Sequence, residues 1–248
     1  MTEKPPYIVS PTADASSTAR PATLIFLHGY GDDADGLPLG LAQQFQFYNK
    51  MQYLKWVLPY APHNQEAMTR AWYVPKALPN AAKPRVPGEA DDETAPDDEA
   101  GIMKSVDTLD QLVEQEIKNG TPPERILVGG FSQGCAVSLV WGLTGRLRNK
   151  VAGVVSLSGY LPLRDRIAEL RKQREVGSDE KEAKQWFFVH GTMDMLVPMK
   201  LFVQANQDLA EWVDKENIDG HVYQGMGHST NSAELRDMLA FFEKVIPA

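Results

Sequence analysis

Ser132 is the residue whose surroundings first suggest chemistry, because glycines stand two places before and two places after it. The stretch 125–137 reads RILVGGFSQGCAV, and its apolar run at 126–128 predicts a buried strand. Gly129 and Gly130 are expected to end that strand, and the apolar residues after the serine predict a buried helix. A serine on a sharp turn from strand to helix is the setting of a nucleophile elbow, in which backbone crowding favours glycine on both sides.

The G-x-S-x-G pattern is weak evidence when it stands alone. With glycine near 7% of residues, it arises by chance in about one chain of this length in fifteen. An ordinary serine in a glycine-rich turn is therefore the alternative. A catalytic serine also needs a base within hydrogen-bond reach and an acid that orients the base, so the rest of the chain decides between the two interpretations.

His228 is the histidine whose place in the chain fits the base. In α/β-hydrolases the chain order is serine, then an acid, then a histidine. His228 lies in the stretch GMGHST, between the last predicted strand and the last predicted helix. An ordinary surface-loop histidine is the alternative. The other histidines either precede Ser132 or stand on predicted strands: His28, His63, His190 and His221.

Asp194 is the candidate for the acid. It lies in the loop VHGTMDMLVP, directly after a strand predicted at 185–191, and no other acidic residue stands in that loop. A carboxylate that caps a turn is the alternative. Ser132, Asp194 and His228 follow one another in the required order, each at the carboxyl end of a predicted strand. That edge is where open α/β sheets bind ligands, so the three together predict acyl transfer through a serine.

Acyl transfer also needs N–H donors for the oxyanion of its tetrahedral intermediate. The backbone N–H of Gln133, the residue after the serine, is the first candidate. The second is the backbone N–H of Tyr30 in the stretch HGYG, which directly follows a predicted core strand. Its two glycines let the backbone turn toward Ser132. A tight exit from the strand is the alternative interpretation of HGYG.

The elements that must hold these residues alternate along the chain. Apolar runs predict strands at 22–28, 54–60, 125–129, 151–159, 185–191 and 220–225. Helical spacing of apolar residues predicts helices at 37–50, 102–117, 133–144, 199–216 and through 235–242. The alternation predicts an α/β fold with a mostly parallel central sheet and helices on both faces, built as a single domain over residues 1–248.

Two segments break the alternation and are expected to be insertions or lid-like loops, at 77–97 and 164–184. The first, with the residues up to 100, holds four prolines and a strong acidic excess. A functional lid and a plain surface or disordered loop are both open for it. The second is densely charged with both signs, which predicts a solvated helix followed by a loop.

The composition excludes several classes of function. A net charge of -8 argues against nucleic-acid binding, because phosphate contacts need clustered lysine and arginine. No apolar run is long enough to predict a membrane span, and the N-terminal stretch lacks the apolar core of a signal peptide. Cys135 is the single cysteine, so a reducing, intracellular compartment is expected. No H-E-x-x-H or paired-cysteine spacing indicates a metal site.

Eight stretches make the chain resemble the acyl-protein thioesterase / carboxylesterase family of lysophospholipase-like α/β-hydrolases. They run in order from about residue 21 to the C-terminus: FLHGYGD, LPYAPHN, AWY, DDEAGI, EIKNGTPPERILVGGFSQG, VAGVVSLSGYLPL, HGTMDMLVP and GMGHS. The resemblance implies the α/β-hydrolase fold, with Ser132 as nucleophile, Asp194 as acid and His228 as base. It also implies that the backbone N–H groups of Tyr30 and Gln133 bind the oxyanion.

The activity that the resemblance implies is hydrolysis of long-chain acyl thioesters on the cysteines of S-acylated proteins, without a cofactor or metal. A general carboxylesterase or lysophospholipase acting on small esters or lysolipids is the alternative within the same class. A non-catalytic binding module on the same fold is the alternative from another class. The residues expected to contact the acyl group are Trp72, Tyr73, Tyr160, Leu161 and Leu196.

The expected partners are S-acylated proteins or small acyl esters, with no nucleic acid and no integral membrane anchor. We expect transient membrane contact and a monomer or weak homodimer. We also expect a cytoplasmic location, with the nucleus as an alternative. The chain departs from the family pattern at Cys135, where a small residue is usual, at Met195, where proline is common, and at Tyr160, where many members have tryptophan. It has no cysteine near its N-terminus, so palmitoyl anchoring is not expected.

Overall fold

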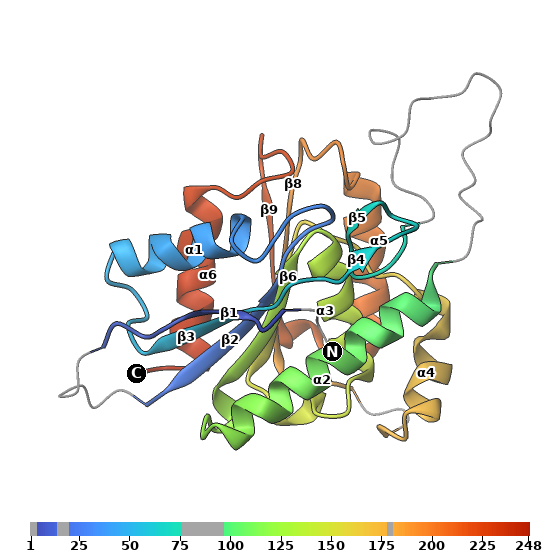
Figure 1. Cartoon of the computed structure of the whole chain (residues 1–248). Coiled ribbons are helices and arrows are strands. Elements are labelled where there is room, and N and C mark those ends of the chain that lie inside the picture. Colours follow the sequence, from blue (N-terminus) through green and yellow to red (C-terminus); the bar gives the residue numbers. More distant parts are fainter. Residues whose placement is uncertain (1–3, 14–19, 76–96, 178–180) are drawn as a thin grey trace.

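A computed structural model describes residues 4–13, 20–75, 97–177 and 181–248. Nearly all of the acidic insertion predicted at 77–97 lies outside these residues. Figure 1 shows that the described part is built around a central sheet with helices on both sides.

The central sheet has seven strands in the order β1-β3-β2-β6-β7-β8-β9 (Figure 1). Its neighbouring strands are parallel, apart from the antiparallel pair of β1 and β3 at one edge. The predicted mostly parallel sheet is therefore confirmed. The strands span Tyr7–Val9 (β1), Ala22–Leu27 (β2), Leu54–Leu58 (β3), Ile126–Phe131 (β6), Gly153–Leu157 (β7), Gln185–Gly191 (β8) and Ile218–Tyr223 (β9).

Three features of the strands differ from the sequence-based expectation. Strand β1 and a hairpin made of β4 (His63–Asn64) and β5 (Thr69–Arg70) were not predicted. Each is two or three residues long, which is too short for an apolar periodicity to develop. Strand β9 also begins two residues before its predicted start, because Gly220 lies inside the ladder with β8.

Helices cover both faces of the sheet, as predicted. One face carries α2 (Glu99–Lys118), α3 (Gln133–Thr144), α4 (Ile167–Gln173) and α5 (Met199–Trp212), and the other carries α1 (Leu37–Phe47) and α6 (Ser232–Val245) (Figure 1). Short 3-10 turns span Pro123–Arg125 (η1), Arg148–Lys150 (η2), Arg164–Arg166 (η3) and Lys215–Asn217 (η4).

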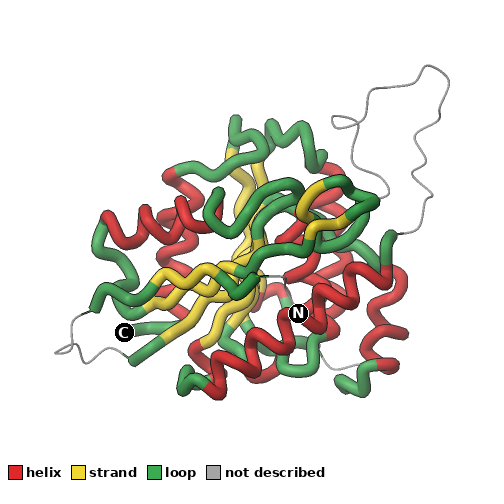
Figure 2. Tube along the Cα trace, in the orientation of Figure 1, coloured by secondary structure: helices red, strands yellow, loops and turns green. Residues whose placement is uncertain are grey.

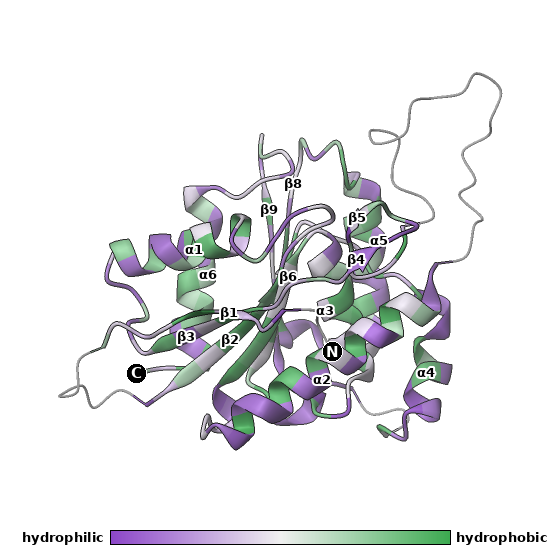
Figure 3. Ribbon diagram, in the orientation of Figure 1, coloured by the Kyte–Doolittle hydropathy of each residue, from purple (hydrophilic) through white to green (hydrophobic). Residues whose placement is uncertain are grey.

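The core lies in two layers, one on each side of the sheet. In β2, Ile25 and Leu27 belong to the layer under α2 and α3, whereas Leu24 and Phe26 belong to the layer under α1 and α6. This division follows from the period-two alternation of a strand. Figure 3 shows the central strands mostly in the hydrophobic colour and the outer sides of the helices in the hydrophilic one.

The expectation that Gly129 and Gly130 end their strand is wrong. Both lie within β6, where Gly129 pairs with Phe26 of β2 and Val155 of β7. A Cβ on Gly129 would stand 2.3 Å from the Val155 carbonyl oxygen. Glycine stands here because the neighbouring backbone comes too close for a side chain. Glycine in a strand can therefore mark close backbone approach as well as the end of the strand.

The expectation that residues 164–184 are solvated is partly wrong. The predicted helix is present as α4, but Arg171, Glu182 and Lys184 of this segment are buried. Charged side chains of opposite sign can enter the interior when they pair with one another, and a composition count does not reveal such pairing.

Candidate active site

Ser132 sits on the turn between β6 and α3, at the carboxyl edge of the sheet. Its backbone has φ 56° and ψ -115°, a conformation that costs a non-glycine residue about 1–3 kcal/mol. The turn is held on both sides, since the Ser132 N–H donates to the Leu157 carbonyl at 2.9 Å and the Ser132 carbonyl accepts from the Ala136 N–H at 3.1 Å. The serine is thus a strained residue in a rigid setting, as a nucleophile elbow requires.

The two glycines of the G-x-S-x-G pattern are both required by close backbone approach. A Cβ on Gly130 would lie 2.4 Å from the carbonyl carbon of Gly134. A Cβ on Gly134 would lie 2.4 Å from the carbonyl oxygen of Leu27, at the end of β2. The start of α3 therefore packs directly on the end of β2, and a substitution at either glycine displaces the elbow.

The loops that follow β8 and β9 lie at the same edge of the sheet (Figure 2). They carry Asp194 and His228, whose side chains meet there. His228 Nδ1 donates to Asp194 Oδ2 at 2.7 Å. Asp194 Oδ1 accepts from the backbone N–H groups of Leu196 at 2.9 Å and Val197 at 2.8 Å. Burial by itself raises the pKa of Asp194, but the hydrogen bonds from His228 and Val197, together with the attraction of the nearby imidazoles, outweigh burial and hold that pKa below its ordinary value.

The imidazole of His228 lies beside the elbow. Its ring centroid is 4.7 Å from that of Phe131, the residue immediately before Ser132. No hydrogen bond joins Ser132 Oγ to His228 in this structure, so Phe131 is the contact that links the imidazole to the turn. With Nδ1–H bound to a carboxylate, the neutral imidazole carries its free lone pair on Nε2, which is the arrangement of a general base.

His190 is the closest competitor for Asp194, but its environment is that of a structural residue. It is fully buried, and its Nε2 donates to the Val197 carbonyl at 2.8 Å while lying 3.7 Å from Asp194 Oδ2. Burial lowers the pKa of His190, so its neutral form is favoured. His190 supports the loop that presents Asp194 and leaves the shorter carboxylate contact to His228.

The backbone groups predicted for the oxyanion lie in two segments that border Ser132. A Cβ on Gly29 would stand 3.3 Å from the Cβ of Ser132, so the segment that leads to Tyr30 passes beside the elbow. Gln133 is the first residue of α3, where backbone N–H groups have no partner inside the helix. The Tyr30 hydroxyl points elsewhere and donates to the Ala67 carbonyl at 2.8 Å. The oxyanion role of the two N–H groups stays a prediction.

The residues predicted to contact the acyl group have different surroundings. Trp72 and Tyr73 are each 3% exposed and belong to the core layer under α2 and α3, which also includes Leu161. The Tyr73 hydroxyl is 3.1 Å from the Tyr160 hydroxyl. Leu196, two residues after Asp194, is 43% exposed. The rings of Trp72 and Tyr73 therefore pack inward, and contact of these five residues with an acyl group stays a prediction.

The side chain of Gln133 is a feature that the sequence did not indicate. Its Oε1 accepts from the Trp72 N–H and its Nε2 donates to the Tyr73 carbonyl, both at 2.8 Å. The available signal was a polar residue at the start of a helix that is otherwise buried. Such a residue must find partners inside the protein.

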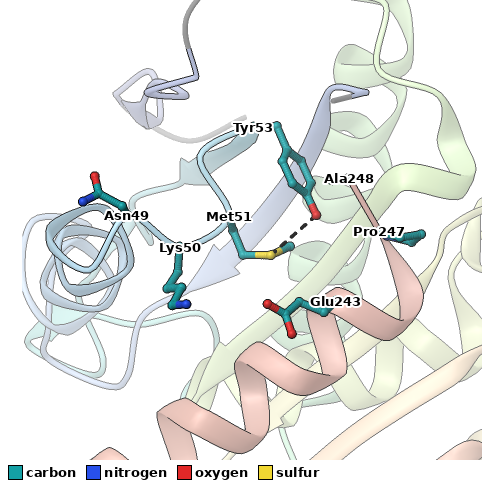
Figure 4. A pocket seen from close by; sticks show the side chains of 7 residues that line it. All are labelled: Asn49, Lys50, Met51, Tyr53, Glu243, Pro247 and Ala248. Atoms are coloured by element: carbon teal, nitrogen blue, oxygen red, sulfur yellow. Dashed lines mark hydrogen bonds between the residues drawn. The ribbon is translucent and has the colours of Figure 1, made fainter. Parts of the chain in front are cut away.

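Other features of the described residues lie apart from this site. The pocket in Figure 4 is between the turn that precedes β3 and the C-terminal residues. There the Tyr53 hydroxyl contacts Met51 Sδ at 3.6 Å and the Ile246 carbonyl at 2.7 Å. Within the described ranges, no group of three or more histidine, cysteine or acidic side chains is arranged to hold a metal ion. No helix in those ranges is both long and apolar enough to cross a bilayer.

Comparisons with known proteins identify the family of the chain. The chain is 33% identical to acyl-protein thioesterase 1 of Yarrowia lipolytica, over 98% of this chain and 99% of that one. It is 35% identical to acyl-protein thioesterase 1 of Mycosarcoma maydis, over 97% of each chain. Among solved structures it is similar to Arabidopsis thaliana SOBER1, with a TM-score of 0.70 and 26% identity over 91% of this chain and 99% of that one. The phospholipase/carboxylesterase family model matches residues 10–246, and the chain therefore belongs to this family of α/β-hydrolases.

Proposed function

We propose that the protein is a serine hydrolase that removes long acyl chains from thioester-linked cysteines of S-acylated proteins. The observation that carries the proposal is the 2.7 Å hydrogen bond between His228 and Asp194, with the imidazole packed against the residue that precedes Ser132. The names of the relatives, acyl-protein thioesterase 1, support the substrate class.

In the proposed reaction, Ser132 Oγ attacks the thioester carbonyl carbon while His228 Nε2 takes the hydroxyl proton. The carbonyl oxygen becomes an oxyanion that accepts from the backbone N–H groups of Tyr30 and Gln133. When the intermediate collapses, the carbon–sulfur bond breaks and the cysteine sulfur leaves with the proton from His228. Water, activated by the same imidazole, then attacks the acyl-serine and releases the fatty acid.

Asp194 has two tasks in this scheme. Its carboxylate holds His228 in the tautomer with Nδ1–H, and its negative charge stabilises the imidazolium that forms during each half-reaction. Its pKa, lowered by hydrogen bonds that outweigh burial, keeps it ionised at neutral pH. The backbone N–H groups of Leu196 and Val197 fix the carboxylate so that it cannot rotate away from the imidazole.

A second candidate is a carboxylesterase that acts on small esters or lysolipids. The family description, which names both phospholipase and carboxylesterase, supports it. The chemistry at Ser132 is the same for an oxyester and a thioester, so the shape of the acyl groove separates the two candidates. We further propose that the enzyme is cytoplasmic, acts as a monomer or weak homodimer, and contacts membranes only transiently.

The test combines one variant with a substrate panel. Ser132→Ala should lower kcat by about 10⁴- to 10⁶-fold for every substrate, because removing a catalytic serine leaves only binding and oxyanion stabilisation. Its melting temperature should stay within about 2 °C of the wild-type value, since a partly exposed serine contributes little to packing. Labelling by a fluorophosphonate should be lost at the same time.

The panel compares an S-palmitoyl peptide, a lysophospholipid, and p-nitrophenyl acetate and palmitate on one preparation. The thioesterase proposal predicts the highest kcat/KM for the S-palmitoyl peptide. A preference for p-nitrophenyl acetate would favour the carboxylesterase, and retained activity in purified Ser132→Ala would rule out both.

A further inference from the structure

The amide side chain of Gln133 binds the main chain of residues 72–73 much as a neighbouring strand would. Its Oε1 accepts from the Trp72 N–H and its Nε2 donates to the Tyr73 carbonyl, both at 2.8 Å. The side chain is buried, with 5% of the residue exposed, so both bonds form away from water. Gln133 also follows Ser132 directly, so any movement of its side chain is passed to the peptide next to the elbow.

Trp72 reaches from the same segment to the other side of the elbow. Its indole Nε1–H donates to the His28 carbonyl at 2.9 Å. That carbonyl belongs to the peptide that joins His28 to Gly29, at the exit of β2 and one residue before Tyr30. The peptide is therefore held in orientation by a buried indole that is itself 3% exposed.

His28 strengthens this connection. Its Nδ1–H donates to the Gly29 carbonyl at 2.8 Å, and its Nε2 accepts from the Ala61 N–H at 3.0 Å. Burial lowers the pKa of His28, which favours the neutral form that these two bonds require. The imidazole also packs on Trp72, with ring centroids 5.2 Å apart. The exit of β2 is thus held by two buried rings.

The segment that carries Trp72 is anchored to a third element. Ser105 Oγ of α2 donates to the Trp72 carbonyl at 2.5 Å, and the Val74 N–H donates to Asp98 Oδ2, at the start of α2, at 2.9 Å. Residues 72–74 are therefore a fixed strut, tied to α2 on one side and to both borders of the elbow on the other.

We propose that the Gln133 side chain and the Trp72 indole are positioning residues that set the separation between the two oxyanion donors, the Tyr30 and Gln133 N–H groups. The inference rests on the proposed function, because it assigns a task to those donors. The Gln133 side chain ties the start of α3, which carries the Gln133 N–H, to the strut. The Trp72 indole ties the exit of β2, which leads to the Tyr30 N–H, to the strut. Neither side chain touches the substrate in this proposal.

The physical reason is that oxyanion stabilisation depends steeply on geometry. The donors must lie within hydrogen-bond distance of a charge that exists only in the transition state, so loss of alignment lowers kcat more than it weakens substrate binding. A displacement near 1 Å costs about 100-fold in rate. Loss of the hydrogen bonds of either Gln133 or Trp72 is expected to displace one oxyanion donor by about this distance or less.

The experiment uses Trp72→Phe, Gln133→Met and a matched control, Ser105→Ala, on the full chain. Trp72→Phe keeps a buried ring but removes the bond to the His28 carbonyl, and Gln133→Met keeps the length of the side chain but removes both bonds. Ser105→Ala also removes a bond to Trp72, but the lost bond faces α2 and not the elbow. Rates are divided by the fraction of protein that a fluorophosphonate labels at completion, so loss of folded protein does not count.

Trp72→Phe and Gln133→Met, the two strut variants, should each lower kcat by about 10- to 100-fold with KM within about threefold of the wild-type value. Affinity for a trifluoromethyl ketone, whose tetrahedral adduct carries the oxyanion, should fall in the same proportion. Ser105→Ala should keep kcat and this affinity within about twofold, even if its melting temperature falls. Unchanged kcat in both strut variants, or an equal loss in Ser105→Ala, would overturn the proposal.

Ser132→Ala separates failure of this inference from failure of the proposed function. If Ser132→Ala loses turnover and trifluoromethyl ketone binding while the strut variants behave as wild type, the serine mechanism stands and the strut does not. If Ser132→Ala retains turnover, the proposed function is wrong. The inference about Gln133 and Trp72 is then wrong as well, because it rests on that function.

Discussion

The two ends of β8 each carry a buried carboxylate, and the two are held in opposite ways. Glu182 stands three residues before the strand and Asp194 three residues after it. Both have nearby basic side chains, and both have a pKa held below the ordinary value. They differ in their hydrogen-bond partners, and that difference separates a carboxylate that holds the fold together from one that is placed to take part in catalysis.

Glu182 is surrounded by the basic side chains of Arg148, Arg171 and Lys184. Burial alone raises its pKa, but Lys184 and Arg148 outweigh burial and lower it. Lys184 Nζ donates to Oε2 at 2.6 Å, while Arg148 Nε and Arg171 Nη1 donate to Oε1 at 2.8 and 2.9 Å. Every member of this cation cluster is nearly inaccessible. It joins α4 and η2 to the segment before β8.

Asp194 has two backbone N–H donors and one imidazole. The backbone groups fix the carboxylate without neutralising it, so its charge acts most strongly on His228 at 2.7 Å and less on His190 at 3.7 Å. His228 differs from the cations around Glu182 because its side chain is 13% exposed and because a neutral imidazole offers a lone pair on its second ring nitrogen, which an ammonium or guanidinium group does not. A buried carboxylate can serve chemistry when a partner that accepts a proton also reaches the surface.

The largest expected effect is at the chemical end of β8. Asp194→Asn should lower kcat by about 10⁴-fold, because the amide cannot stabilise the imidazolium and favours the wrong tautomer of His228. The measurement is kcat per fluorophosphonate-reactive site. A loss of less than tenfold would mean that Asp194 only supports the fold of its loop, and the contrast with Glu182 would disappear.

At the structural end of β8, Glu182→Gln should lower the free energy of unfolding by about 3–5 kcal/mol, since it leaves Arg148, Arg171 and Lys184 without their shared carboxylate. Urea denaturation measures this change. The value of kcat per labelled site should stay at the wild-type level.

The matched control for this prediction is Glu124→Gln, which breaks an exposed pair with Arg20 and should cost less than about 1 kcal/mol. If Glu182→Gln costs no more than this control, the cation cluster does not hold α4 to the sheet.

The smallest expected effect is a pH dependence that belongs to Lys184. Burial lowers its pKa to about 8, from an ordinary 10.5. The attraction of Glu182 offsets only part of this effect, and repulsion from Arg148 and Arg171 adds a little to it. Between these two values the unfolded chain holds a proton that the folded chain lacks, so the contribution of Lys184 to stability rises with pH. Relative to Lys184→Met, the wild-type free energy of unfolding should rise by at most about 1.4 kcal/mol per pH unit from pH 8 to pH 10.

Urea titrations at pH 7.5 and 9.5 test this dependence. Lys181→Met, which removes an exposed lysine paired with Asp214, should show no such trend relative to the wild type. A difference between wild type and Lys184→Met that stays constant over this range would contradict a lowered pKa at Lys184.

Local patterns predicted the fold well where one short segment decides its own structure. Strand 185–191 and helix 133–144 have the predicted bounds, because apolar residues there follow a clear period or run. The G-x-S-x-G pattern predicted the turn at Ser132, and the close contacts of Gly130 and Gly134 explain why the pattern is informative. The bounds of β6 were missed because a glycine that relieves crowding and a glycine that ends a strand look alike in a sequence.

Predictions about surroundings were less successful than predictions about elements. Trp72 and Tyr73 were expected to contact the acyl chain, which stays a prediction, but their packing in the core and their bonds to Gln133 beside the elbow were not foreseen. Arg171 and Lys184 were expected to be solvated and are buried around Glu182. In both cases residue type indicated what a side chain could do, but not what faced it.

The sequence by itself determined the alternation of strands and helices, the strained turn at Ser132, and the order in which serine, acid and histidine follow along the chain. Tertiary structure alone decided which of these residues meet. Asp194 and His228 are 34 positions apart, and Trp72 and Gln133 are 61 apart. Periodicity reports which side of an element is buried, because that depends on the residues of the element itself. Contacts across such separations depend on the order of the strands in the sheet and on the paths of the loops between them, which no local pattern contains.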